Sequence, residues 1–199
     1  MRVKVCGLTR MCDVEAALTA GVDALGFVVW PRSPRAVSVD ALSTLLRRVP
    51  PFVTAVAVTV SPTTDDVRRL WDAGCHWVQV HGEVPVWPDG GHLLRAISWN
   101  AERHAWTPDD GGEAAVLVDA HDPVRHGGTG HRADWEQAAA LAKTRAIVLA
   151  GGLTPDTVGE AVQVVRPWAV DVSSGVEEAP GIKSAARIAA FVAAARRQA

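Results

Sequence analysis

Hydrophobic residues along this chain gather in short continuous runs, separated by longer stretches in which apolar positions recur with helical spacing. A run without polar alternation is typical of a strand buried on both faces, and strands separated by helices pair in parallel. The pattern therefore predicts a parallel α/β protein. Eight runs have the length of a strand: residues 3–6, 24–29, 54–58, 77–80, 93–97, 115–119, 146–150 and 169–173.

The first residues of several helices can be predicted from the sequence. Capping side chains or prolines precede the predicted helices 63–73, 135–141 and 156–164, and a last helix is predicted over 184–197. Eight strand–helix units in 199 residues favour a single domain over residues 1–199, folded as a closed (β/α)₈ TIM barrel. An open, doubly wound sheet is the alternative.

Two of the units have weak helices. Residues 84–92 contain two prolines and two glycines, so the fourth helix is predicted to be shortened to a turn or lost. Residues 100–106 have the length for two helical turns before the PDDGG segment at 108–112 stops them. The fifth helix is therefore expected to be short, with its loss as the alternative.

Composition narrows the possible partners. The chain is 48% apolar and 21% charged with a net charge of −2, which is typical of a globular protein that binds neither nucleic acid nor a membrane surface. It shows no apolar stretch long enough to span a bilayer and no signal peptide, so a cytoplasmic location is expected. Three cysteines without paired spacing indicate reduced thiols. A small-molecule substrate is favoured.

Two reactive side chains end predicted strands. Cys6 ends the first run and is followed by Gly7, and Asp119 ends the sixth. The carboxyl ends of parallel strands meet at one rim, so a thiol base and a carboxylic acid are predicted to face each other there. Burial in an apolar mouth would raise the pKa of Asp119. The alternatives are that Cys6 merely fills space and that Asp119 caps the next loop.

A thiol needs nearby positive charge to act as a base near neutral pH. Arg35 is the first candidate, because it follows the second run in a proline-rich loop, residues 30–35, that overhangs the rim. Its guanidinium also suits a substrate carboxylate, whereas a solvated loop arginine is the alternative. Lys4 is expected to be committed to Asp171 inside the barrel as a structural ion pair, with Asp171 as a reserve acid.

Glycine-rich segments follow the last three runs, and each exposes backbone N–H groups that can cradle a phosphate. Any one glycine could instead simply permit a tight turn. His81 ends the fourth run, where it either contacts the site or packs. A metal site is not expected, although His121, His126 and His131 lie near one another in sequence. The candidate phosphate residues are Gly128, Gly130, Gly151, Gly152, Ser173, Ser174 and Gly175.

Six ordered segments together make the chain similar, nearly from end to end, to the phosphoribosylanthranilate isomerase family of tryptophan biosynthesis. They are residues 4–9 (KVCGLT), 26–35 (GFVVWPRSPR), 78–83 (VQVHGE), 127–130 (GGTG), 149–155 (LAGGLTP) and 170–177 (VDVSSGVE).

The resemblance implies a (β/α)₈ barrel that performs a cofactor-free Amadori rearrangement of N-(5-phosphoribosyl)anthranilate into 1-(2-carboxyphenylamino)-1-deoxyribulose 5-phosphate. It implies Cys6 as general base, Asp119 as general acid and Arg35 at the anthranilate carboxylate. The glycine loops with Ser173 and Ser174 then hold the phosphate. A monomer or a homodimer is expected.

The chain departs from the family pattern at Ala36, at residues 131–133 and at Ser184. These departures leave open a paralogue that acts on a related phosphorylated aminoaldose, or a weakly active barrel that binds a phosphorylated aromatic ligand. Cys6 argues against the related histidine-pathway isomerase, whose rim should carry an aspartate there. The scarcity of lysine argues against an aldolase.

Overall fold

The structure is a computed structural model that describes residues 1–199 except 76, 101, 103–104, 108–114, 120–130 and 198–199. Eight parallel strands form a ring, and the pairing of β4 with β5 closes it. The barrel strands are β1 (Arg2–Val5), β2 (Ala24–Val28), β3 (Thr54–Val60), β4 (Trp77–His81), β5 (His92–Asn100), β7 (Ala115–Asp119), β8 (Ala146–Ala150) and β9 (Ala169–Val172).

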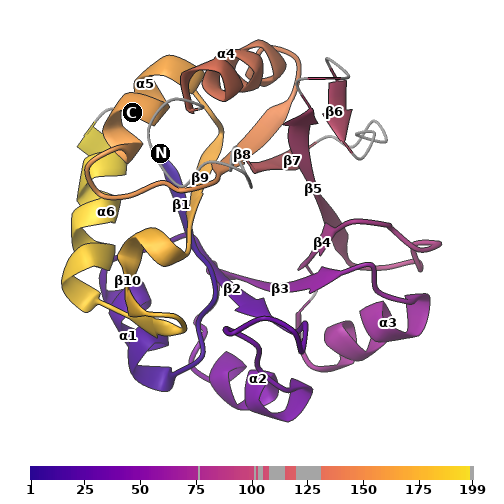
Figure 1. Cartoon of the computed structure of the whole chain (residues 1–199). Coiled ribbons are helices and arrows are strands. Elements are labelled where there is room, and N and C mark those ends of the chain that lie inside the picture. Colours follow the sequence, from indigo (N-terminus) through magenta and orange to yellow (C-terminus); the bar gives the residue numbers. More distant parts are fainter. Residues whose placement is uncertain (76, 101, 103–104, 108–114, 120–130, 198–199) are drawn as a thin grey trace.

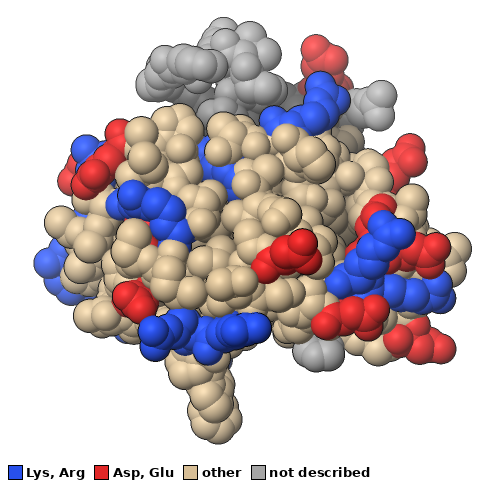
Figure 2. All heavy atoms as spheres, turned by 90° about the horizontal axis from the view of Figure 1, so that it is seen from below, with Lys and Arg blue, Asp and Glu red and all other residues tan. Residues whose placement is uncertain are grey.

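Helices surround this ring (Figure 1), and the predicted TIM-like barrel is confirmed. The described residues contain six α-helices: α1 (Met11–Thr19), α2 (Val39–Leu46), α3 (Thr64–Asp72), α4 (His131–Ala142), α5 (Val158–Val165) and α6 (Ala185–Arg197). None of them is long and apolar enough to cross a membrane. On the face shown in Figure 2, positive and negative side chains lie interspersed.

A capping box sets the start of α3. α3 begins after Thr63, whose side chain accepts a hydrogen bond from the Asp66 N–H while Asp66 accepts one from the Thr63 N–H. This reciprocal capping box makes Thr63 the N-cap, so the helix predicted over residues 63–73 begins one residue later, at Thr64. The Ser61 hydroxyl instead accepts a hydrogen bond from the Glu83 N–H at 3.0 Å.

The predicted loss of the fourth helix is confirmed. Residues 82–91, between β4 and β5, contain no helix. Trp87 of this connection packs edge to face on Trp71 of α3, with ring centroids 5.9 Å apart, and the Thr64 hydroxyl donates to the Val86 carbonyl. Gly91 has a positive φ and lies directly against the Trp71 indole, where a Cβ atom would clash. Aromatic packing thus covers the wall that a helix would otherwise cover.

For the fifth helix, the described residues fit the alternative, its loss. β5 continues to Asn100 and pairs antiparallel with β6 (Ala105–Thr107). Trp99 lies opposite Trp106 in this hairpin, with ring centroids 5.3 Å apart. Cross-strand aromatic pairs of this kind stabilise a hairpin, and two short helical turns offer no comparable contact.

Side-chain alternation along the strands divides the core in two. Outward-facing residues pack against the helices in the large cluster, whereas a smaller cluster fills the barrel interior with Leu94, Ala96, Leu117, Val148, Ala150 and Ala169. Lys4 and Asp171 are register partners on β1 and β9. The Lys4 Nζ donates to the Asp171 carboxylate at 3.0 Å, and both side chains are buried. The predicted structural ion pair is therefore confirmed.

Replacement of Lys4 by methionine should destabilise the protein by about 3–5 kcal/mol, because it leaves the Asp171 charge buried without a partner. Chemical denaturation measures the difference, and Lys4→Met/Asp171→Asn should recover part of the loss. The exposed Arg68–Asp65 pair provides the matched control, since Arg68→Met should cost less than about 1 kcal/mol. A Lys4→Met protein as stable as the Arg68→Met protein would contradict a structural role for the ion pair.

Candidate active site

A cavity of about 440 Å³ opens at the carboxyl ends of the barrel strands. The catalytic side chains predicted from the sequence, Cys6 and Asp119, both line it, as do Arg35 and His81. Residues of the second half of the chain complete the lining: Gly151, Gly152, Ser173 and Ser174. The common edge formed by parallel strands thus brings together groups more than 100 residues apart in sequence.

Cys6 directly follows β1, and its N–H donates to the Val172 carbonyl at 2.8 Å, which continues the β1–β9 ladder by one residue. The thiol is buried beside β2, where Gly26 faces it. A Cβ atom at position 26 would lie 2.8 Å from the Cys6 sulfur, so a glycine is required at this position. Sequence and packing together therefore fix where the thiol sits.

Burial raises the pKa of the Cys6 thiol, while the positive charges of Lys4 and Lys183 act in the opposite direction. The Asp171 carboxylate adds to the raising effect. Lys4 therefore contributes to the Cys6 environment although it is paired with Asp171. Lys183 supplies a second cation near Cys6, which reasoning from the sequence missed. The scarcity of lysine in this chain was the one feature of the sequence that could have drawn attention to this residue.

Asp119 ends β7 on the same rim, beside Ala150 of β8 in the strand register. His81 lies close enough to Asp119 for the two side chains to interact electrostatically. Burial lowers the pKa of His81, and the Asp119 carboxylate partly offsets this effect. The Gln79 and His81 side chains lie 2.8 Å apart through their Nε2 atoms, so the amide orients the ring. The cavity therefore holds an acidic group and an imidazole side by side.

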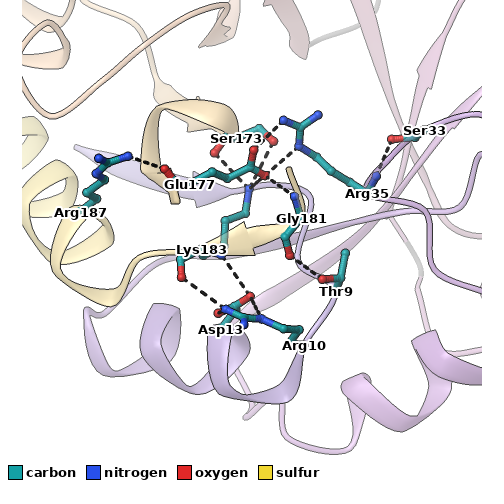
Figure 3. Close-up of polar contacts among 10 residues, drawn as sticks. All are labelled: Thr9, Arg10, Asp13, Ser33, Arg35, Ser173, Glu177, Gly181, Lys183 and Arg187. Atoms are coloured by element: carbon teal, nitrogen blue, oxygen red, sulfur yellow. Dashed lines mark hydrogen bonds and ion pairs between the residues drawn. The ribbon is translucent and has the colours of Figure 1, made fainter. Parts of the chain in front are cut away.

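Arg35 is held in the cavity wall by a carboxylate that sequence reasoning did not select. Its Nε and Nη2 donate to the two Glu177 oxygens at 2.8 and 2.6 Å (Figure 3). Burial would raise the pKa of Glu177, but hydrogen bonds from Arg35 and Lys183 outweigh it and lower the pKa to about 2. Glu177 ends the segment 170–177, one of the six segments that resemble the isomerase family. Its position directly after the glycine-containing turn could have identified it as a candidate site residue.

The glycine segments divide into two groups. Gly151 and Gly152 line the cavity with φ values of +92° and +63°, a region that side chains disfavour, so they turn backbone toward the cavity without a Cβ atom. Ser173 and Ser174 lie beside them in the lining. Gly175 is instead packed against the Leu153 carbonyl, where a Cβ atom would clash, so the structure shows a packing role for it.

Some of the candidates lie outside the described residues. Gly128 and Gly130 belong to the segment 120–130, as do His121 and His126. Their predicted roles, including the expectation that these histidines hold no metal, stay predictions.

A parallel barrel with acid and base candidates on one rim is typical of barrel enzymes that catalyse proton transfer. A family model described as N-(5'-phosphoribosyl)anthranilate (PRA) isomerase matches residues 3–194. The chain belongs to this family.

Individual relatives agree with this assignment. An N-(5'-phosphoribosyl)anthranilate isomerase from Geobacter sp. (strain M21) is 42% identical over 200 residues, covering 98% of each chain. One from Chromohalobacter salexigens is 45% identical over 201 residues, covering 96% of this chain and 92% of its own. The crystal structure of phosphoribosyl anthranilate isomerase from Thermotoga maritima superposes with a TM-score of 0.86 at 34% identity, covering 99% of each chain.

A further solved isomerase structure, with a TM-score of 0.81 and 31% identity over 99% of each chain, is a complex with reduced 1-(o-carboxyphenylamino)-1-deoxyribulose 5-phosphate.

The raised pKa of Cys6 predicts slow alkylation in the native protein. Iodoacetamide attacks the thiolate, so the rate of Cys6 modification should still increase above pH about 9. Peptide mass spectrometry follows each site, and the exposed Cys12 thiol serves as an internal reference that should react faster at neutral pH. A Cys6 rate that levels off below pH about 8 would show that the nearby lysines dominate over burial.

Proposed function

We propose that this chain converts N-(5'-phosphoribosyl)anthranilate into 1-(2-carboxyphenylamino)-1-deoxyribulose 5-phosphate, the isomerisation step of tryptophan biosynthesis, with Cys6 as base and Asp119 as acid. The observation that carries the proposal is the single cavity that both side chains line. Membership of the isomerase family supports the reaction itself. The reaction is an internal rearrangement with no net oxidation or reduction, and acid–base groups can catalyse its proton transfers, so the proposal includes no cofactor.

The chemistry begins with Asp119, which protonates the furanose ring oxygen. The bond from this oxygen to C1 breaks, and the anthranilate nitrogen lone pair forms the C1=N bond of a Schiff base. The Cys6 thiolate then removes the proton from C2, and the electron pair moves into a C1=C2 bond while the nitrogen becomes neutral. The resulting enolamine tautomerises to the ketone when C1 gains a proton and the C2 hydroxyl loses one.

Substrate binding uses the two sides of the cavity. The phosphate is assigned to the side lined by Gly151, Gly152, Ser173 and Ser174, and the anthranilate carboxylate to Arg35. Gly128 and Gly130 complete the phosphate site in this proposal. His81, which also lines the cavity, contacts the substrate in this proposal.

Assembly as a monomer or a homodimer stays a prediction. Among the relatives, the Thermotoga maritima isomerase is dimeric and has been solved in monomeric form as well.

The first test is a fluorescence assay of phosphoribosylanthranilate consumption by the purified protein. Cys6→Ser and Asp119→Asn should each reduce kcat by at least about 10²-fold, which is the usual contribution of a positioned base or acid. Cys12→Ser is the matched control and should keep normal turnover. A kcat within about tenfold of the wild type in either variant would remove that residue from its role, and an inactive wild type would overturn the proposed reaction.

Arg35→Ala should mainly raise KM, since the guanidinium binds the substrate carboxylate in both the ground state and the transition state. Steady-state kinetics separates the two constants, with the exposed Arg32 of the same loop mutated to alanine as the control. An unchanged KM would exclude Arg35 from the substrate site.

A further inference from the structure

A short hairpin after the last barrel strand places two buried charges next to the cavity. It consists of β10 (Glu177–Ala179) and β11 (Ile182–Lys183), and the mechanism above uses neither Glu177 nor Lys183. We propose that Glu177, supported by Lys183, is a positioning residue of the isomerase, which fixes the Arg35 guanidinium in the orientation that receives the substrate carboxylate. This inference rests on the proposed function.

The geometry of the Arg35–Glu177 pair leaves the guanidinium able to bind a second carboxylate. Glu177 contacts the side edge, formed by Nε and Nη2, so that the remaining terminal nitrogen, Nη1, lies on the side away from Glu177 (Figure 3). A planar guanidinium carries five N–H donors and can accept one carboxylate on each edge. Glu177 therefore orients Arg35 without using all of its donors.

Glu177 is itself held rigidly. Its Oε1 accepts hydrogen bonds from the Lys183 Nζ at 2.8 Å and from the Gly181 N–H at 3.2 Å, and its side chain is only 5% exposed. The Arg187 guanidinium donates to the Glu177 carbonyl oxygen. Because the carboxylate accepts four hydrogen bonds from three residues, Arg35, Gly181 and Lys183, it has little freedom to follow a moving arginine.

Lys183 also links this support to Ser173. Its Nζ also donates to the Ser173 carbonyl at 3.0 Å, and Ser173 lines the cavity on the side assigned to phosphate. The lysine side chain is fully buried, and its backbone N–H donates to the Asp13 carboxylate of α1. One buried ammonium group thus contacts both the carboxylate that holds Arg35 and a residue assigned to the phosphate.

Removing the charge of Glu177 tests the proposal. Positioning of Arg35 and long-range attraction of the anionic substrate predict opposite changes in KM. Arg35, Lys183 and Glu177 together carry one net positive charge, and Glu177→Gln would add one more beside an anionic substrate. If long-range attraction alone mattered, KM would fall. If Glu177 positions Arg35, KM rises instead, because the neutral amide holds the guanidinium far less strongly.

We expect Glu177→Gln to raise KM about tenfold or more with kcat changed less than about threefold. The adjacent, exposed Glu178→Gln removes the same charge from the same hairpin and should leave KM unchanged.

A double-mutant cycle separates positioning from general stabilisation of the hairpin. In an Arg35→Ala background, Glu177→Gln should have no further effect on KM, since the residue that it positions is absent. Additive effects, or a KM for Glu177→Gln at or below that of the wild type, would overturn the inference.

Arg35→Lys tests the same inference without altering Glu177. A lysine keeps the charge but cannot bind two carboxylates on separate planar edges, so KM should approach that of Arg35→Ala. A wild-type KM in Arg35→Lys would overturn the inference even if Glu177→Gln did not fold. Both results require an active wild-type enzyme, whose inactivity would instead refute the proposed function.

Discussion

Closure of the eight-stranded sheet is the constraint on which the rest of this structure depends. Hydrogen bonding between β4 and β5 completes the ring. Once the ring is closed, all carboxyl ends of the parallel strands share one rim, and residues that are distant in sequence become neighbours there. The lost fourth helix does not weaken this arrangement at the rim, because Trp71 and Trp87 cover the outside of the barrel at that point.

The closed ring has a narrow interior, and the charged side chains inside it and beside the cavity are paired with one another. Lys4 and Asp171 neutralise each other in the interior, while Glu177 neutralises one of the two cations, Arg35 and Lys183, beside the cavity. The buried charges therefore leave a modest positive surplus near Cys6. Such a surplus suits a substrate with a phosphate and a carboxylate, and it counteracts part of the effect of burial on the thiol.

Much of the fold could be predicted from local pattern. Each of the eight barrel strands lies where a continuous apolar run predicts it, and two prolines and two glycines indicated the missing helix. Local pattern left two alternatives open where contacts between elements compete with local preference. Residues 100–106 have helical length, but the Trp99–Trp106 contact favours a hairpin, and no local rule weighs that contact against two helical turns.

The sequence by itself determined the barrel, the family and the residues at the strand ends, because periodicity and short motifs are local properties of the chain. Only the tertiary structure decided which of those residues share a cavity and which partner each charge takes. Arg35 and Glu177 lie 142 residues apart, and their ion pair follows from the proximity of the β2 loop to the β10–β11 hairpin. Pairing of buried charges depends on distances of a few ångströms, which emerge only after the ring has closed.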